Sequence, residues 1–272
     1  MDFITIRTSD RLFWLGRYKL AAKTPQLAVG SSQSLRVIPH TGVVQRCTTL
    51  IRETQPTNAN WKITDAFGNH VVCGYDYTPT DLFNFHEWGT VVTGLADSEP
   101  VEPFEQLQKF RFGGHLITFG SALKTFDYTV IHPLMGSDSF LNAHIIMTQV
   151  YQYMTYTKGV TNVKTTSEEA AALKKGVCQD YAHVMIALCR MEGLTARYVT
   201  GFLIGEGESH AWVEVLVRDR WYGFDPTNNV HPTFRHIRVA VGRDADDCPM
   251  NRGIIYGKAN QIVNVAVKVW EQ

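Results

Sequence analysis

Short runs of alternating or β-branched hydrophobic residues fill the first hundred residues of the chain. Segments rich in Pro, Gly, Asn and Asp, namely PHTG, QPTNAN and DAFGN, separate these runs. Such a pattern is typical of β-strands joined by turns. It predicts an antiparallel β-sandwich over residues 1–100. The expected strands are FITIRT, SLRVIP, VVQRCTTLIRE, NWKITD, HVVCGYDY and TVVTG.

The pattern changes after the acidic, proline-containing segment ADSEPVEPFEQ. We expect residues 101–138 to form a linker or helical connection. From Ser139 to Tyr156, apolar residues recur at spacings near 3.6, which predicts a helix. The segment TTSEEAAALKKG predicts a second helix, because Thr166 and Glu169 have the spacing of a capping box.

A third helix is expected to begin at Cys178, with an apolar stripe that ends at Gly193. Three strand-like runs follow it, namely ARYVTGFLI, HAWVEVLV and WYGFDPTNN. Helices followed by antiparallel strands indicate an α+β fold rather than alternating βαβ units. We therefore expect residues 139–272 to form one core of helices packed on an antiparallel sheet.

Composition narrows the choice of partners and location. The chain has 26 basic and 26 acidic residues, so its formal net charge is zero, and no long run of one sign occurs. This balance does not favour nucleic acid or an anionic membrane as a partner. No segment approaches the roughly 18 uninterrupted apolar residues of a membrane span, and the N-terminal residues lack the pattern of a signal peptide. We expect a cytoplasmic protein that does not bind membranes.

The five cysteines are scattered and form no Cys-x-x-Cys pair, which argues against a disulfide framework or a thiolate zinc site. Cys178 is distinctive because it lies in the first turn of a predicted helix. Unpaired N–H groups and the helix dipole favour an anion there, so a thiol at this position can act as a nucleophile. The alternative is a small buried apolar residue, as most free cysteines are.

A nucleophilic cysteine needs a base that a third group holds in orientation. His210 begins a predicted strand after the GEGES loop, and Asp225 ends the next strand before Pro226. The three residues follow the order Cys, His, Asp. Taken singly, the histidine could be a structural residue and the Asp-Pro pair a simple turn.

The spacing of His210 and Asp225 predicts an irregular hairpin. A tight turn with Arg218 opposite Trp221 would pair Asp225 with Glu214, about 13 Å along the strand from His210. A longer loop that starts near Leu216 would bring Trp212 opposite Asp225, and twist or a bulge would have to supply the remaining approach.

Three segments, GVCQDYAHVMIALCRMEGLTARYVTGFL, SHAWVEV and WYGFDPTNN, resemble the core motifs of the bacterial transglutaminase-like superfamily, which is related to papain-type cysteine proteases. The similarity is most specific between Tyr153 and Gly257, and the N-terminal half more loosely resembles the β-sandwich that often precedes this core. The resemblance implies a catalytic core over residues 139–272. It also implies that Cys178 is the nucleophile, His210 the base and Asp225 the residue that orients the histidine.

The activity implied by the resemblance is acyl transfer on an amide bond through a thioester. A peptidase or amidase would use water to resolve the thioester, and a protein-glutamine transamidase would use an amine. The substrate would be a peptide, an amide or a protein, and no cofactor is expected. A catalytically silent protein-binding scaffold and a metal-dependent hydrolase are the competing hypotheses.

Further residues are candidates for supporting roles. Asn142 and Gln149 on the preceding helix could donate to an oxyanion, and Asp180 could support the helix start. Possible cleft-lining residues are Trp212, Arg243 and Asp247; the last two could instead form a structural ion pair. His231 and His236 are interpreted as a pair of loop residues rather than metal ligands. No calcium loop is found in the sequence, and no metal is expected.

Overall fold

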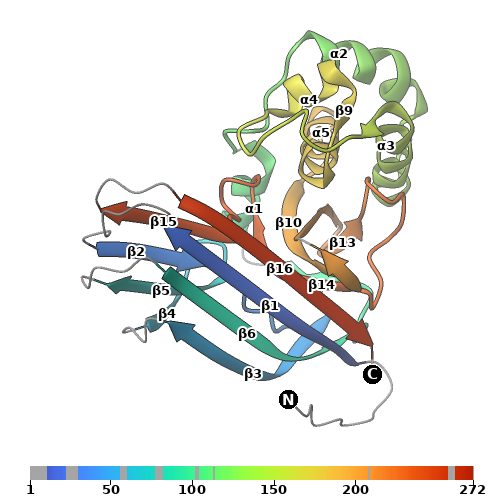
Figure 1. Cartoon of the computed structure of the whole chain (residues 1–272). Coiled ribbons are helices and arrows are strands. Elements are labelled where there is room, and N and C mark those ends of the chain that lie inside the picture. The colour runs from blue at the N-terminus through green and yellow to red at the C-terminus, as the bar shows by residue number, and fades with distance from the viewer. Residues whose placement is uncertain are drawn as a thin grey trace.

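The computed structural model describes residues 11–22, 30–55, 60–76, 82–101, 104–112, 114–207, 209–256 and 261–271. The helices gather at one end of the molecule, and the long strands form the other end (Figure 1). The predicted strand FITIRT lies outside the described residues.

The strand-rich part is a β-sandwich of two antiparallel sheets, as the sequence predicts. One sheet has the order β11-β16-β1-β6-β3 and the other has the order β15-β2-β5-β4. The first consists of β11 (Gly205–Gly207), β16 (Gln261–Glu271), β1 (Arg11–Ala22), β6 (Leu82–Thr93) and β3 (Gln45–Gln55). The second consists of β15 (Asn251–Tyr256), β2 (Gly30–Leu35), β5 (His70–Asp76) and β4 (Asn60–Thr64). Alternate side chains of the two sheets meet in one apolar core that includes Leu35, Val72, Phe85, Val91 and Val267.

Both C-terminal strands belong to this sandwich. β16 pairs with β1 from Leu12 opposite Glu271 to Ala22 opposite Gln261, and β15 pairs with β2. Figure 1 shows the red β16 beside the blue β1. From the sequence, we expected residues 1–100 to form the sandwich and residues 139–272 to form the core. The structure instead pairs two strands of the second segment, β15 and β16, with strands of the sandwich. Alternation along a strand identifies its buried face but not its partner, so the sequence pattern could not assign these strands.

The connection between the two halves contains several short elements. They are β7 (Glu99–Pro100), α1 (Phe104–Phe112), α2 (Ser121–Phe126), a π-helical turn (Asp127–Ile131) and a 3-10 turn (His132–Leu134). The carboxylate of Glu168 accepts hydrogen bonds from the backbone N–H groups of Gly120, Ala122 and Leu123 at the start of α2. This contact ties the connection to the helical core.

The helical core contains α3 (Ser139–Tyr153), α4 (Ser167–Leu173) and α5 (Cys178–Met191), with the short strands β8 (Thr155–Tyr156) and β9 (Lys175–Gly176) between them. The Thr166–Glu169 capping box at the start of α4 is formed as predicted. The helices pack on an antiparallel sheet of order β14-β10-β12-β13-β7. Its further strands are β14 (His236–Gly242), β10 (Ala196–Leu203), β12 (His210–Val217) and β13 (Arg220–Phe224).

The two faces of this sheet have different partners. Ala211, Val213 and Val215 belong to the helical core. The alternating residue Trp212 points to the other face, where it packs with Val199, Val241 and Phe67. Phe67 lies in the turn between β4 and β5, so the sandwich covers this second face next to the start of β12.

The β12–β13 hairpin is regular, so the predicted irregularity is wrong. Val217 pairs with Arg220 and Val213 with Phe224 without a register shift. Only Arg218 and Asp219 form the turn, and Arg218 adopts a φ of 58°. Continuing this register places Asp225 opposite Trp212, two residues from His210, so no bulge is required.

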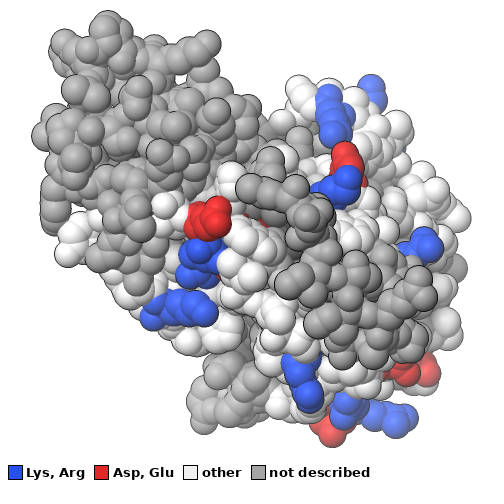
Figure 2. Space-filling view, turned by 60° about the horizontal axis from the view of Figure 1, so that its bottom comes forward, with Lys and Arg blue, Asp and Glu red and all other residues white. Residues whose placement is uncertain are grey.

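The described helices include none that is long and apolar enough to cross a membrane. On the face shown in Figure 2, the described basic and acidic side chains are scattered rather than gathered in one patch. This distribution agrees with the balanced charge of the chain.

Candidate active site

Cys178 is the first residue of α5, as the sequence predicts, and its half-buried side chain packs against the helical core. The preceding backbone is held in place by Asp180, whose Oδ2 accepts from the Val177 N–H at 2.7 Å and from the Thr161 hydroxyl at 2.7 Å. The first N–H groups of a helix have no intrahelical acceptor. The thiol lies at this N-terminus, where the helix dipole favours an anion.

His210 is the first residue of β12, and its side chain is 11% exposed. Its Nε2 lies 2.8 Å from Oδ2 of Asp225. Burial by itself lowers the pKa of His210, but hydrogen bonds to Asp225 and to Cys178 outweigh burial and raise the pKa to about 9. The imidazole therefore links the thiol to the carboxylate and favours its charged form.

Asp225 follows β13 and is fully buried. Its Oδ1 accepts from the backbone N–H groups of Thr227 at 3.0 Å and Asn228 at 3.2 Å, and its Oδ2 accepts from the Asn228 side chain at 2.8 Å. Burial raises the pKa of Asp225, but the hydrogen bonds from His210 and His236 outweigh burial and hold the pKa well below its usual value. Asp225 is therefore a carboxylate with a fixed orientation.

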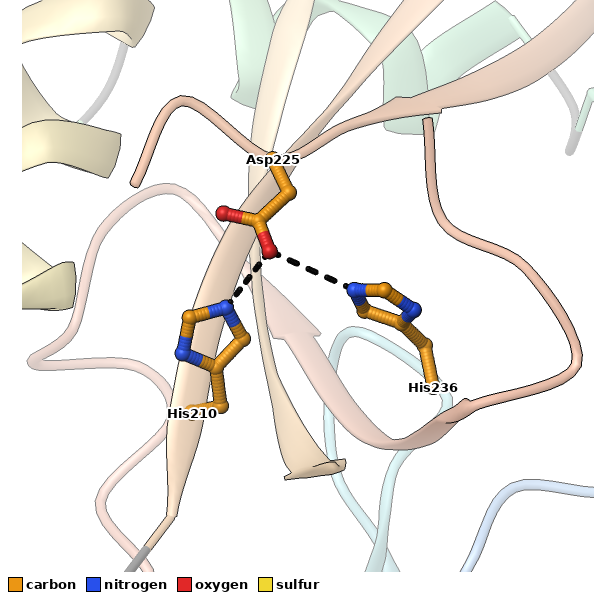
Figure 3. A group of neighbouring side chains, drawn as sticks. All are labelled: His210, Asp225 and His236. Atoms are coloured by element: carbon orange, nitrogen blue, oxygen red, sulfur yellow. Dashed lines mark hydrogen bonds and ion pairs between the residues drawn. The ribbon is translucent and has the colours of Figure 1, made fainter. Parts of the chain in front are cut away.

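His236 is part of this group, although the sequence indicated only a loop residue. It is the first residue of β14, and its Nε2 lies 3.3 Å from Oδ2 of Asp225. Figure 3 shows both histidines pointing at the same carboxylate oxygen from opposite sides. No motif in the sequence connects position 236 with position 225, because the contact depends on how the loop between them folds back.

Among the described residues, His210, Asp225 and His236 are close enough together to be considered as metal ligands. The tautomer of His236 argues against this use. Its Nδ1 accepts a hydrogen bond from the Thr233 N–H at 3.2 Å, so the proton of the neutral ring lies on Nε2. A protonated Nε2 has no lone pair for a metal ion, whereas it can donate to Asp225.

The other candidate residues have different surroundings. The side chain of Asn142 bonds both the N–H and the carbonyl oxygen of Gly136, at 2.9 and 2.8 Å, so its amide is occupied in a loop contact. Gln149 lies half-buried on α3. Asp180 supports the start of α5 through its contacts with Val177 and Thr161.

Trp212 is buried beneath the two histidines, with ring centroids 6.2 Å from His210 and 5.3 Å from His236. Arg243 and Asp247 form a two-point ion pair, with Nε–Oδ2 at 2.7 Å and Nη2–Oδ1 at 2.9 Å. These contacts are those of a structural ion pair, which was the alternative to a cleft-lining role for these two residues.

Comparisons with known proteins agree with this geometry. Residues 135–226, which contain Cys178, His210 and Asp225, match the family model of the transglutaminase-like superfamily. An uncharacterized protein of Mycobacterium tuberculosis is 38% identical over 141 residues, which cover 46% of this chain and 45% of that protein. One from Mycobacterium leprae is 36% identical over 124 residues, with coverages of 42% and 44%. The chain spans about half the length of the curated relatives it matches.

The fold of the whole chain is similar to a solved structure of a candidate cysteine protease from Cytophaga hutchinsonii. The TM-score is 0.80 at 20% sequence identity, and the similarity covers 97% of this chain and 91% of the other. The shared fold therefore includes the β-sandwich as well as the helical core. Residues 135–226 are thus similar to the core of the transglutaminase-like superfamily.

Proposed function

We propose that the protein is a cysteine enzyme that transfers acyl groups from amide bonds, with a peptide or a related amide as substrate and water as acceptor. The observation that carries this proposal is the hydrogen bond of the buried His210 to Asp225, with Cys178 close enough to His210 to help raise the pKa of the imidazole. Acyl transfer by a thiol needs three groups in contact one after another. They are a thiol at a helix start, an imidazole and a buried carboxylate.

In the first half of the reaction, His210 accepts the thiol proton on Nδ1, because Nε2 donates to Asp225. The sulfur of Cys178 attacks the amide carbon, and a C–S bond forms as the carbonyl electrons move to oxygen. The N–H of Cys178 donates to that oxyanion. Collapse breaks the C–N bond, and His210 returns its proton to the leaving amine.

In the second half, His210 removes a proton from water, which attacks the thioester. The C–S bond breaks, the thiol is restored and the acid leaves. Asp225 keeps the imidazole in one orientation and stabilises its charged form throughout. The name of the Cytophaga hutchinsonii structure supports a peptide substrate by analogy of fold.

Intact-mass labelling with limiting iodoacetamide, from about pH 5 to about pH 9, tests the activated thiol. We expect rapid labelling of the wild type at the acidic end, none at this site in Cys178→Ala, and slow labelling in His210→Ala. Cys47→Ser and Cys73→Ser are matched controls, because these two cysteines are also half-buried. Labelling that follows an ordinary thiol, or that a chelator abolishes, contradicts the proposal.

Turnover then tests the choice of acceptor. Peptide amides are incubated with the wild type and with Cys178→Ala, with and without a primary amine. Release of free acid that does not require the amine supports hydrolysis. Products that contain the amine, with no acid formed in its absence, would establish transamidation instead.

A further inference from the structure

Two histidines share one oxygen of Asp225. His210 Nε2 lies 2.8 Å and His236 Nε2 lies 3.3 Å from Oδ2, and the Asn228 side chain donates to the same atom at 2.8 Å. Figure 3 shows the carboxylate between the two rings. The acyl-transfer mechanism uses only one of these histidines, so the second requires an explanation.

His236 is held as a neutral donor. The Thr233 N–H donates to its Nδ1 at 3.2 Å, and a turn closed by the His236 N–H and the Thr233 carbonyl oxygen, at 3.0 Å, fixes this contact. A proton on Nδ1 would face the Thr233 N–H, donor against donor. His236 therefore gives the Nε2 proton to Asp225 without adding a positive charge.

Asp225 does not need His236 to stay in place. The backbone N–H groups of Thr227 and Asn228 hold Oδ1, and the Asn228 side chain holds Oδ2. The contribution of His236 is therefore electrostatic: each donor on a carboxylate disperses its negative charge and weakens its hold on the other donors. The hydrogen bond that His236 weakens in this way is the one from the His210 ring to Asp225.

Several charged groups lie near His236. Arg235, next to it in the chain, has its guanidinium over the ring of Phe234. Asp225 from the end of β13 and His210 from β12, 6.2 Å away between ring centroids, face it directly. Arg238, two residues along β14, is paired with Glu214 and Glu99. Leu203 lies opposite His236 on β10 and carries no charge. The interaction that His236 can weaken is therefore the electrostatic attraction between the Asp225 carboxylate and the His210 ring.

We propose that His236 is a positioning residue that acts through Asp225 and limits how strongly the carboxylate stabilises the charged form of the His210 ring. This inference rests on the proposed function, since it concerns the same thiol chemistry. When the charged form is less strongly stabilised, the ring releases its Nδ1 proton more readily at the step where it passes from acid to base.

The test is the pH profile of Cys178 alkylation in His236→Phe and His236→Gln. Phe retains a ring beside Trp212 but cannot donate, whereas Gln can donate to Asp225 and accept from Thr233. In His236→Phe, we expect the alkaline step of the profile, where His210 loses its proton, to move up by about half a pH unit. His236→Gln should keep the wild-type midpoint.

An unchanged or lower midpoint in His236→Phe, or an equal shift in His236→Gln, overturns the inference. If His236→Phe does not fold by circular dichroism, His236→Leu replaces it with the same expected shift. If the wild type shows no alkylation at the acidic end, the proposed function fails. Acidic alkylation of the wild type with a His236→Phe profile identical to it overturns only the role of His236.

Discussion

Gly176 lies so close to Asp180 that a Cβ atom on residue 176 would stand 2.5 Å from the Cβ atom of Asp180. Asp180 is 1% exposed and holds Val177 and Thr161. We expect Gly176→Ala to displace this carboxylate and to leave its donors unpaired. The free energy of unfolding, measured by urea denaturation, should fall by about 1–3 kcal/mol.

Gly207→Ala is the matched control, because no atom lies within 4 Å of a Cβ built on Gly207. That variant should unfold like the wild type. If Gly176→Ala is as stable as the wild type, the observed position of the Asp180 carboxylate does not contribute to the free energy of unfolding.

His210 makes the stability depend on pH. Its pKa is raised from 6.5 to about 9 in the folded protein, so the native state binds this proton more tightly than the unfolded state does. The stabilisation is fully present below pH 6.5 and is lost as the pH rises toward 9. The loss is at most on the order of 3 kcal/mol.

Urea unfolding of the wild type and of His210→Ala, compared at several pH values across this window, measures that loss. Groups that do not contact His210 titrate equally in both proteins, so the difference between the two pH dependences reports His210 together with its partners Cys178 and Asp225. If the free energy of unfolding depends on pH in the same way in both proteins, the raised pKa of His210 makes no contribution to stability.

The sequence pattern predicted the elements around the site well. The helix beginning at Cys178, the strand beginning at His210 and the strand that ends before Asp225 all occur where periodicity placed them. These are local properties, because side-chain alternation and capping act within a few residues. The approach of His210 to Asp225 is not such a local property: the family resemblance implied it, whereas the tight hairpin considered from the sequence left the two residues about 13 Å apart along the strand.

Contacts that depend on loop geometry could not be predicted. Arg218 takes a positive φ, which residues other than Gly, Asn and Asp rarely adopt, so the two-residue turn was not evident from its sequence. His236 reaches Asp225 only because the loop before β14 returns to the end of β13. The pairing of β16 with β1 joins the two ends of the chain, and no local pattern reports it.

A buried ion pair lies on the sheet face opposite the helical core, where α1 also packs. Arg197 Nε donates to Glu214 Oε2 at 2.7 Å, and Arg197 also lies 4.2 Å above the ring of Trp221. Glu214→Ala leaves the Arg197 guanidinium buried without its carboxylate. We expect a loss of about 3–5 kcal/mol in the free energy of unfolding, because an unpaired buried charge is costly.

Glu206→Ala is the control for this prediction. Glu206 pairs with Lys268 on the surface of the sandwich, where its side chain is 71% exposed, so its removal should give no measurable change. A Glu214→Ala variant as stable as Glu206→Ala would show that Arg197 finds another partner or water.

The assignment of the last strand to the sandwich can be tested at two adjacent residues. Val267 on β16 is 4% exposed and packs in the sandwich core, whereas its neighbour Ala266 is exposed. Val267→Asn places an amide without a partner in that core and removes apolar burial, so stability should fall by about 2–4 kcal/mol. Ala266→Asn changes the same strand on its solvent face and should cost much less. Val267→Asn also loses more β-propensity than Ala266→Asn does, but the whole propensity scale spans only about 1 kcal/mol, so a larger difference between the two variants reports the burial of Val267. If both lose the same stability in thermal and urea unfolding, β16 does not complete the sandwich core as its register with β1 requires.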